Sequence, residues 1–120
     1  MSLWRFNNAE FEIDFTDAAF MEKVENAYQN MIEDLKHVQK VGKQSEIIRS
    51  KCNVFFKFFE SVFGPGSREK LFGDKVSINL CVQASESLYN FGAQEEDRYR
   101  QIANKYNPKK RNYPKKKYYG

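Results

Sequence analysis

The chain has few of the residues that build redox and metal sites. Its 120 residues include two cysteines, Cys52 and Cys81, and one histidine, His37. A disulfide framework calls for more cysteines in a shorter chain, so we expect two buried free thiols in a reducing compartment. His37 lies off the apolar seam of its predicted helix and is interpreted as a solvated surface residue. Without a second histidine or a paired cysteine motif, we expect no metal site.

Motifs for phosphate binding and catalysis are also missing. The glycines of FGPGSREKLFG form neither a GxGxxG nor a GxxxxGK[ST] pattern. Glu95, Glu96 and Asp97 are adjacent on a predicted helix, so their side chains point in different directions and favour a solvated face. No acid–base or nucleophilic constellation is present. The sequence therefore predicts a protein that is not an enzyme and uses no cofactor.

No apolar run approaches the roughly 20 residues of a membrane span. Residues 1–14 alternate charged and aromatic side chains, unlike a signal peptide. We therefore expect a soluble, cytosolic protein that does not contact a membrane.

Positive charge is concentrated at the C-terminus. The formal net charge is +4, and residues 107–120 contribute +6, so residues 1–106 carry 4 − 6 = −2. Residues 107–120 are mostly polar and contain two prolines, so they cannot form a packed core, and we expect a disordered basic tail. Three roles stay open for it: binding nucleic acid, binding an acidic protein, or no specific role. Nucleic acid is the least favoured partner, because the body lacks a basic surface. The basic residues of the tail are Lys109, Lys110, Arg111, Lys115, Lys116 and Lys117.

The pattern of apolar residues predicts a mainly α-helical fold. We expect a small bundle of three to four helices, an N-terminal β-hairpin over residues 3–15 turning at Asn7-Asn8, and a single domain over residues 1–106. Thr16 or Asp17 caps a first helix over residues 17–41. A second helix begins at Ser45 and ends at Phe63, and Ser67 caps a short third helix. The last helix begins near Ser77, and Gly92 leaves open whether it is one helix or two.

The second predicted helix and the segment after it hold six of the eleven phenylalanines. The apolar side chains from Ile48 to Phe63 cover roughly 160° of the helix, wider than the stripe of about 100° that a surface helix needs. This helix therefore packs on two neighbours in its own domain, or on one neighbour and a second protein. Phe58 lies at the edge of the arc and is the candidate for an exposed contact, whereas Phe55 and Phe59 are core candidates. The predicted partner-binding residues are Phe55, Phe56, Phe58, Phe59, Phe63 and Phe72.

The hairpin needs a surface to cover its aromatic face, because an isolated two-stranded hairpin is marginal in water. It either lies on a helix of its own chain or pairs with another chain by β-augmentation. For the second case, the predicted self-association residues are Trp4, Phe6, Phe11 and Ile13.

Three stretches, EFEIDFTDAAFMEKVENA, SEIIRSKCNVFFKFFESVFGPGSREKLFG and KYNPKKR, occur in this order. Together they resemble a family of small tail-region proteins from siphophages and prophages of Firmicutes that look like tail assembly chaperones. The resemblance covers nearly all of residues 9–111, and its most specific part is the phenylalanine helix that continues into VFGPGSREKLFG.

The resemblance implies a non-catalytic role in the host bacterial cytoplasm. Such chaperones coat the aggregation-prone tape-measure protein before the tail tube forms, assemble as oligomers along it, and are absent from the mature virion. The alternatives are a nucleic-acid-binding accessory protein that acts through the basic tail, and a minor structural virion protein.

Overall fold

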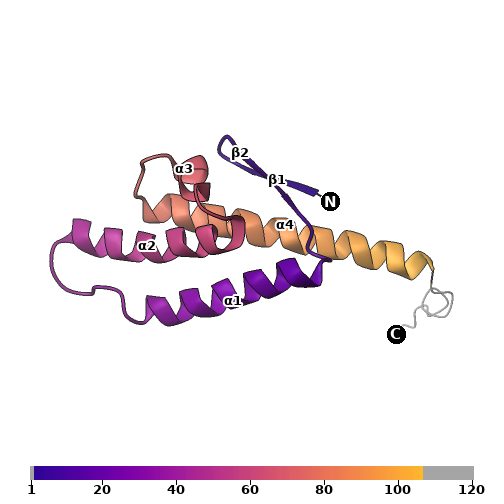
Figure 1. The fold of residues 1–120 in the computed structure, drawn as a ribbon, viewed down its shortest axis with the longest axis horizontal. Helices are drawn as coiled ribbons and strands as arrows, with labels where there is room; N and C mark the ends of the chain where they lie inside the picture. Colours follow the sequence, from indigo (N-terminus) through magenta and orange to yellow (C-terminus); the bar gives the residue numbers. More distant parts are fainter. Residues whose placement is uncertain (1, 107–120) are drawn as a thin grey trace, which may run out of the picture.

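The computed structural model describes residues 2–106, which form a two-stranded hairpin and four helices (Figure 1). The predicted fold class, mainly helical with an N-terminal hairpin, is confirmed. The predicted tail, residues 107–120, lies outside the described residues. No helix within residues 2–106 is long and apolar enough to cross a membrane. The elements are β1 (Ser2–Phe6), β2 (Ala9–Ile13), α1 (Ala18–Leu35), α2 (Gln44–Phe63), α3 (Ser67–Phe72) and α4 (Ile78–Lys105).

The hairpin lies on the helices of its own chain. Its strands are antiparallel, with Phe6 opposite Ala9, and Asn7 takes the positive φ of 54° that the tight turn requires. The Asn7 side-chain amide donates to the carbonyl of Leu71 at 2.7 Å, which ties the turn to α3. Trp4 is 1% exposed and stacks on Phe59. The aromatic face of the hairpin was expected to lie on a helix of its own chain or to pair with another chain. The structure shows the first arrangement.

The first helix begins as predicted but ends early. The Asp17 carboxylate caps it by accepting from the Phe20 N–H at 2.9 Å. The predicted end at residue 41 is wrong, because α1 stops at Leu35. The chain then turns toward α2, where the backbone N–H of Gln39 donates to Ser50 Oγ at 2.9 Å. In a longer helix, the Gln39 N–H would donate to a backbone carbonyl four residues earlier; here it donates to Ser50 instead. The apolar pattern continues to Val38, but its last part is not helical.

The central helix α2 packs against α1 on one side and against α3 and α4 on the other. It ends at Gly64, and α3 follows as predicted. Ser67 does not cap α3 with its side chain. Its buried hydroxyl instead donates to the carbonyls of Phe59 at 3.2 Å and Gly64 at 2.8 Å, which fixes the turn between the two helices.

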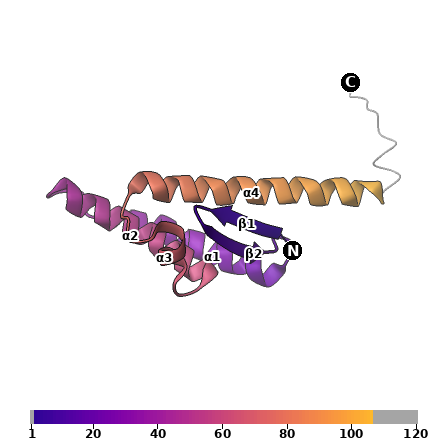
Figure 2. The same cartoon turned by 90° about the horizontal axis from the view of Figure 1, so that it is seen from above.

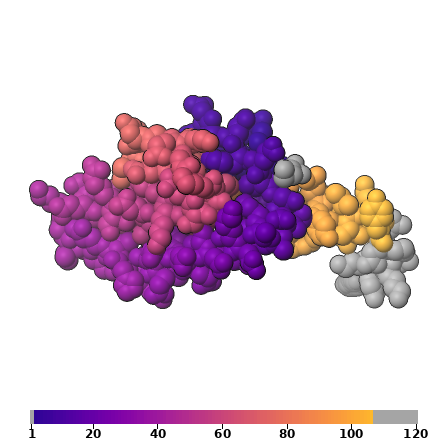
Figure 3. All heavy atoms as spheres, viewed as in Figure 1, coloured from indigo at the N-terminus to yellow at the C-terminus, as the bar shows by residue number. Residues whose placement is uncertain are grey.

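The last helix α4 is one continuous helix, so Gly92 does not break it. Ser77 caps it by accepting from the Leu80 N–H at 3.3 Å. Its N-terminal half packs on α2 and β1, while residues 96–106 are all exposed. Figures 2 and 3 show this C-terminal part extending beyond the rest of the molecule.

Candidate functional site: an apolar groove between α1 and α4

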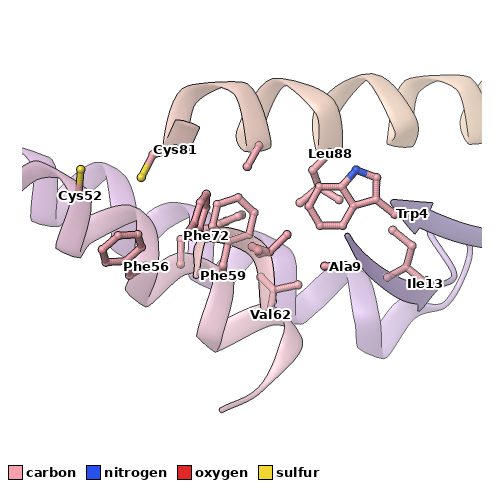
Figure 4. Close-up of a cluster of buried hydrophobic side chains, with 14 residues drawn as sticks. Trp4, Ala9, Ile13, Cys52, Phe56, Phe59, Val62, Phe72, Cys81 and Leu88 are labelled. Carbon is pink, nitrogen blue, oxygen red and sulfur yellow. The ribbon is translucent and has the colours of Figure 1, made fainter. Parts of the chain in front are cut away.

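The phenylalanines predicted to bind a partner belong mostly to the core (Figure 4). Phe56, Phe58, Phe59 and Phe72 are buried, and Phe55 and Phe63 are partly buried. The expectation that Phe58 is exposed is wrong: its side chain is 7% exposed and meets Phe59 edge-on at 5.2 Å between ring centroids. The wide apolar arc is covered because α2 has neighbours on both sides.

The hairpin residues predicted for self-association also contribute to the core. Trp4 and Ile13 are buried, and Phe6 and Phe11 are partly buried against the same cluster. The Trp4 indole Nε1 donates to Ser87 Oγ on α4 at 3.0 Å. In the described chain these side chains therefore do not form an exposed surface for self-association.

The two cysteines are free and buried, as expected. Cys52 on α2 and Cys81 on α4 point into the space between their helices (Figure 4). Burial, together with the neighbouring Cys52 thiol, raises the pKa of Cys81 to about 12. Burial also raises the pKa of Cys52. Both side chains are held as neutral thiols, which suits packing and not nucleophilic attack.

The charged residues singled out in the sequence lie on the surface. His37 is exposed, with its Nε2 3.7 Å from a Glu33 carboxylate oxygen. Glu96 and Asp97 both pair with Arg100, at 3.3 and 3.5 Å. Within residues 2–106, no three His, Cys, Asp or Glu side chains are grouped to hold a metal ion.

A hollow of about 830 Å³ lies between α1 and α4, and we call it the α1–α4 groove. Phe58 of α2 also lines it, as does Phe15, which precedes α1. Most of the wall is apolar or aromatic. From α1 it contains Met21, Val24, Tyr28 and Met31, and from α4 Ser85, Leu88, Tyr89, Gly92, Ala93, Glu95, Glu96 and Tyr99.

The groove is open and acidic along its α4 side. Tyr28 and Tyr89 remain 50% and 77% exposed, so large ring surface faces solvent. Glu95 accepts from the Ser2 hydroxyl at 2.5 Å and from Arg98 at 3.1 Å, and the Ser2 hydrogen bond lowers the pKa of Glu95. The Ser85 hydroxyl is buried in the wall without a hydrogen-bond partner among the described residues. The groove therefore combines apolar surface, negative charge and an unpaired polar group.

Sequence reasoning identified one wall of this groove but not its openness. The seam Met21, Val24, Tyr28 and Met31 shows the 3–4 spacing of a helix face. That spacing alone cannot distinguish a covered seam from an open one. The tyrosines were the available signal, because they tolerate partial exposure better than aliphatic side chains.

The fold and the groove define a small helical protein with a hairpin packed on its core and an apolar cleft open to solvent. Neither a curated protein nor a solved structure gives a significant match to the chain. The chain belongs to DUF6673, a family of unknown function, whose pattern matches residues 7–119.

Proposed function

We propose that this protein is a non-catalytic chaperone that binds an amphipathic helix of a client protein in the α1–α4 groove. The observation that carries the proposal is the groove itself. It has a volume of about 830 Å³, a mostly apolar wall, and lies open to solvent between two helices. Binding an apolar helix face in such a groove is a common mode of peptide recognition.

The lining suits a client whose sequence varies along its length. Met21 and Met31 have flexible, polarisable side chains that adapt to differently shaped surfaces. Tyr28 and Tyr89 offer large rings with polar tips, a combination enriched at interfaces. Glu95 and Glu96 place negative charge at the wall, so the favoured client helix carries basic residues beside its apolar stripe.

The resemblance to phage tail proteins suggests the tape-measure protein as the client. A tape-measure protein is long and rich in helices, and its apolar faces need cover until the tail tube surrounds it. A small protein with one helix-binding groove supports that role when many copies bind along the client. The protein would then act in the host cytoplasm and leave before the virion is complete.

The proposal is tested with a fluorescein-labelled peptide of about 20 residues, with leucines at i, i+3, i+4 and i+7 and lysines between them. Fluorescence anisotropy should show saturable binding to the full chain and weak binding of a scrambled peptide of the same composition. Tyr28→Asp, in the groove wall, should weaken binding at least about tenfold. Tyr106→Asp, outside the groove, is the control and should leave peptide affinity undiminished.

Equal binding of both peptides, or no effect of Tyr28→Asp, would contradict the groove as a helix site. The client hypothesis predicts that a very long, helix-rich protein is encoded next to this one, and co-expression with that protein tests it. The wild type should keep that protein soluble and co-purify with it, whereas Tyr28→Asp should do neither.

A further inference from the structure

We propose that the exposed C-terminal part of α4 from a second copy of this chain occupies the α1–α4 groove, so that two copies cap each other in the absence of client. This inference concerns the regulation of the groove and rests on the proposed function only in taking the groove as a helix-binding site.

The first observation is an uncovered apolar stripe on α4. Tyr99 and Ile102 of α4 and the C-cap residue Tyr106 follow at intervals of three and four residues and are 57%, 45% and 82% exposed. We call these three residues the α4 stripe. Most helical stability in proteins comes from packing an apolar face, yet residues 96–106 are all exposed in the described chain. The stripe therefore calls for a covering surface.

The second observation is that stripe and groove fit one another in position and length. Leu88, Gly92 and Glu95 of the groove wall precede the stripe on the same face of α4, at the same spacing of three and four. The α4 stripe from Tyr99 to Tyr106 spans about 10 Å, and the groove extends along α4 from Ser85 to Tyr99, about 21 Å, so that Tyr99 belongs to both.

Because stripe and groove lie on one continuous helix face, two copies related by a two-fold axis can exchange them in an antiparallel arrangement. Each contact is then made twice, which doubles the buried area, as in an isologous dimer.

The third observation is charge complementarity. Residues 98–106 carry Arg98, Arg100 and Lys105 and no acidic residue, whereas Glu95 and Glu96 line the groove. Glu25 adds negative charge on the helix face that also presents Met21 and Tyr28. Within one copy, Arg98 pairs with the partly buried Glu95 and Arg100 with the exposed Glu96, so the dimer would exchange these pairs for pairs between copies. Exposed pairs such as Arg100–Glu96 are weak, so that exchange costs little.

Sedimentation equilibrium of the full chain without client tests the inference. The wild type should form dimers. Ile102→Asp in the stripe and Tyr28→Asp in the groove should each weaken dimerisation at least about tenfold. Asn104→Asp adds the same charge on the opposite side of the helix and should have little effect.

Mixing the two defective variants separates this arrangement from others. A heterodimer of Ile102→Asp and Tyr28→Asp retains one intact stripe in one intact groove, so the mixture should associate more strongly than either variant alone. Direct pairing of two stripes predicts no effect of Tyr28→Asp and would overturn the inference, as would a wild type that is monomeric at every concentration.

Peptide binding distinguishes this inference from the proposed function. Ile102→Asp keeps the groove and should bind the amphipathic peptide at least as tightly as the wild type. If Ile102→Asp remains dimeric while the peptide binds, the self-capping inference fails and the proposed function stands. If the dimer depends on stripe and groove while no peptide binds, the inference stands and the client role fails.

Discussion

Gly92 of α4 lies against the ring of Phe15. A Cβ at position 92 would come within 3.1 Å of Phe15 Cε1 and Cζ, closer than ordinary van der Waals contact. Phe15 in turn meets Phe20 edge-on at 5.5 Å and Phe91 at 6.1 Å between ring centroids. A glycine in mid-helix thus allows the segment that enters α1 to pack closely on α4.

This contact predicts that alanine at position 92 is favourable only when Phe15 is absent. In a Phe15→Ala background, Gly92→Ala should stabilise the fold by about 1 kcal/mol through helix propensity. In the wild type the gain should be smaller or reversed, because the ring must move. Denaturant unfolding of the two single variants and the double variant measures the coupling. Equal effects of Gly92→Ala in both backgrounds would show that the ring imposes no constraint.

Phe58→Ala should destabilise the fold by about 3–5 kcal/mol, because it leaves a cavity at a buried ring. Lys57→Ala, at the preceding position, is the matched control. It removes an exposed ion pair to Asp34 at 3.1 Å and should cost less than about 1 kcal/mol. Urea unfolding followed by circular dichroism gives both values. A small loss for Phe58→Ala would mean that this ring contributes little to the core.

Ser87→Ala should lower the free energy of unfolding by about 1–3 kcal/mol, because it leaves the Trp4 indole N–H of the hairpin without its acceptor on α4. Trp4 is the only tryptophan, so its fluorescence reports this site directly. We expect a blue-shifted native emission and a lower unfolding midpoint in the variant. Ser61→Ala, an exposed serine of α2, should leave the midpoint close to that of the wild type.

The pKa of Cys81 predicts a loss of stability at alkaline pH. The folded chain holds this proton up to a pKa of about 12, whereas the group's ordinary value is 9.0. The unfolded chain therefore loses the proton first, and stability falls as pH rises from about 9 towards 12.

Cys81→Ala should flatten this decline relative to the wild type, while tyrosines and lysines affect both proteins alike. Chemical denaturation at about pH 8, 9 and 10, around the pH at which the decline begins, gives the change in unfolding free energy with pH for each protein. Parallel slopes for the two proteins would rule out Cys81 as the source.

The sequence alone determined the kinds of elements and most of their limits. Asn7-Asn8 specified the hairpin turn, Asp17 and Ser77 the starts of two helices, and the glycines after Phe63 the end of α2. These signals are local, because turn and cap residues act on backbone groups a few positions away. The dense phenylalanine cluster likewise indicated the core, with Phe59 fully buried.

Only the tertiary structure decided which apolar faces are covered. Phe58 lies at the edge of its helix arc yet is buried, whereas Tyr28 belongs to a regular apolar seam yet is half exposed. α1 also ended at Leu35, before its apolar pattern did, and the Gln39 N–H beyond it donates to Ser50 of the next helix. Helical periodicity defines a face and its width, but coverage depends on how many neighbours reach that face and how far apart they pack. The open groove between α1 and α4 is a property of that spacing.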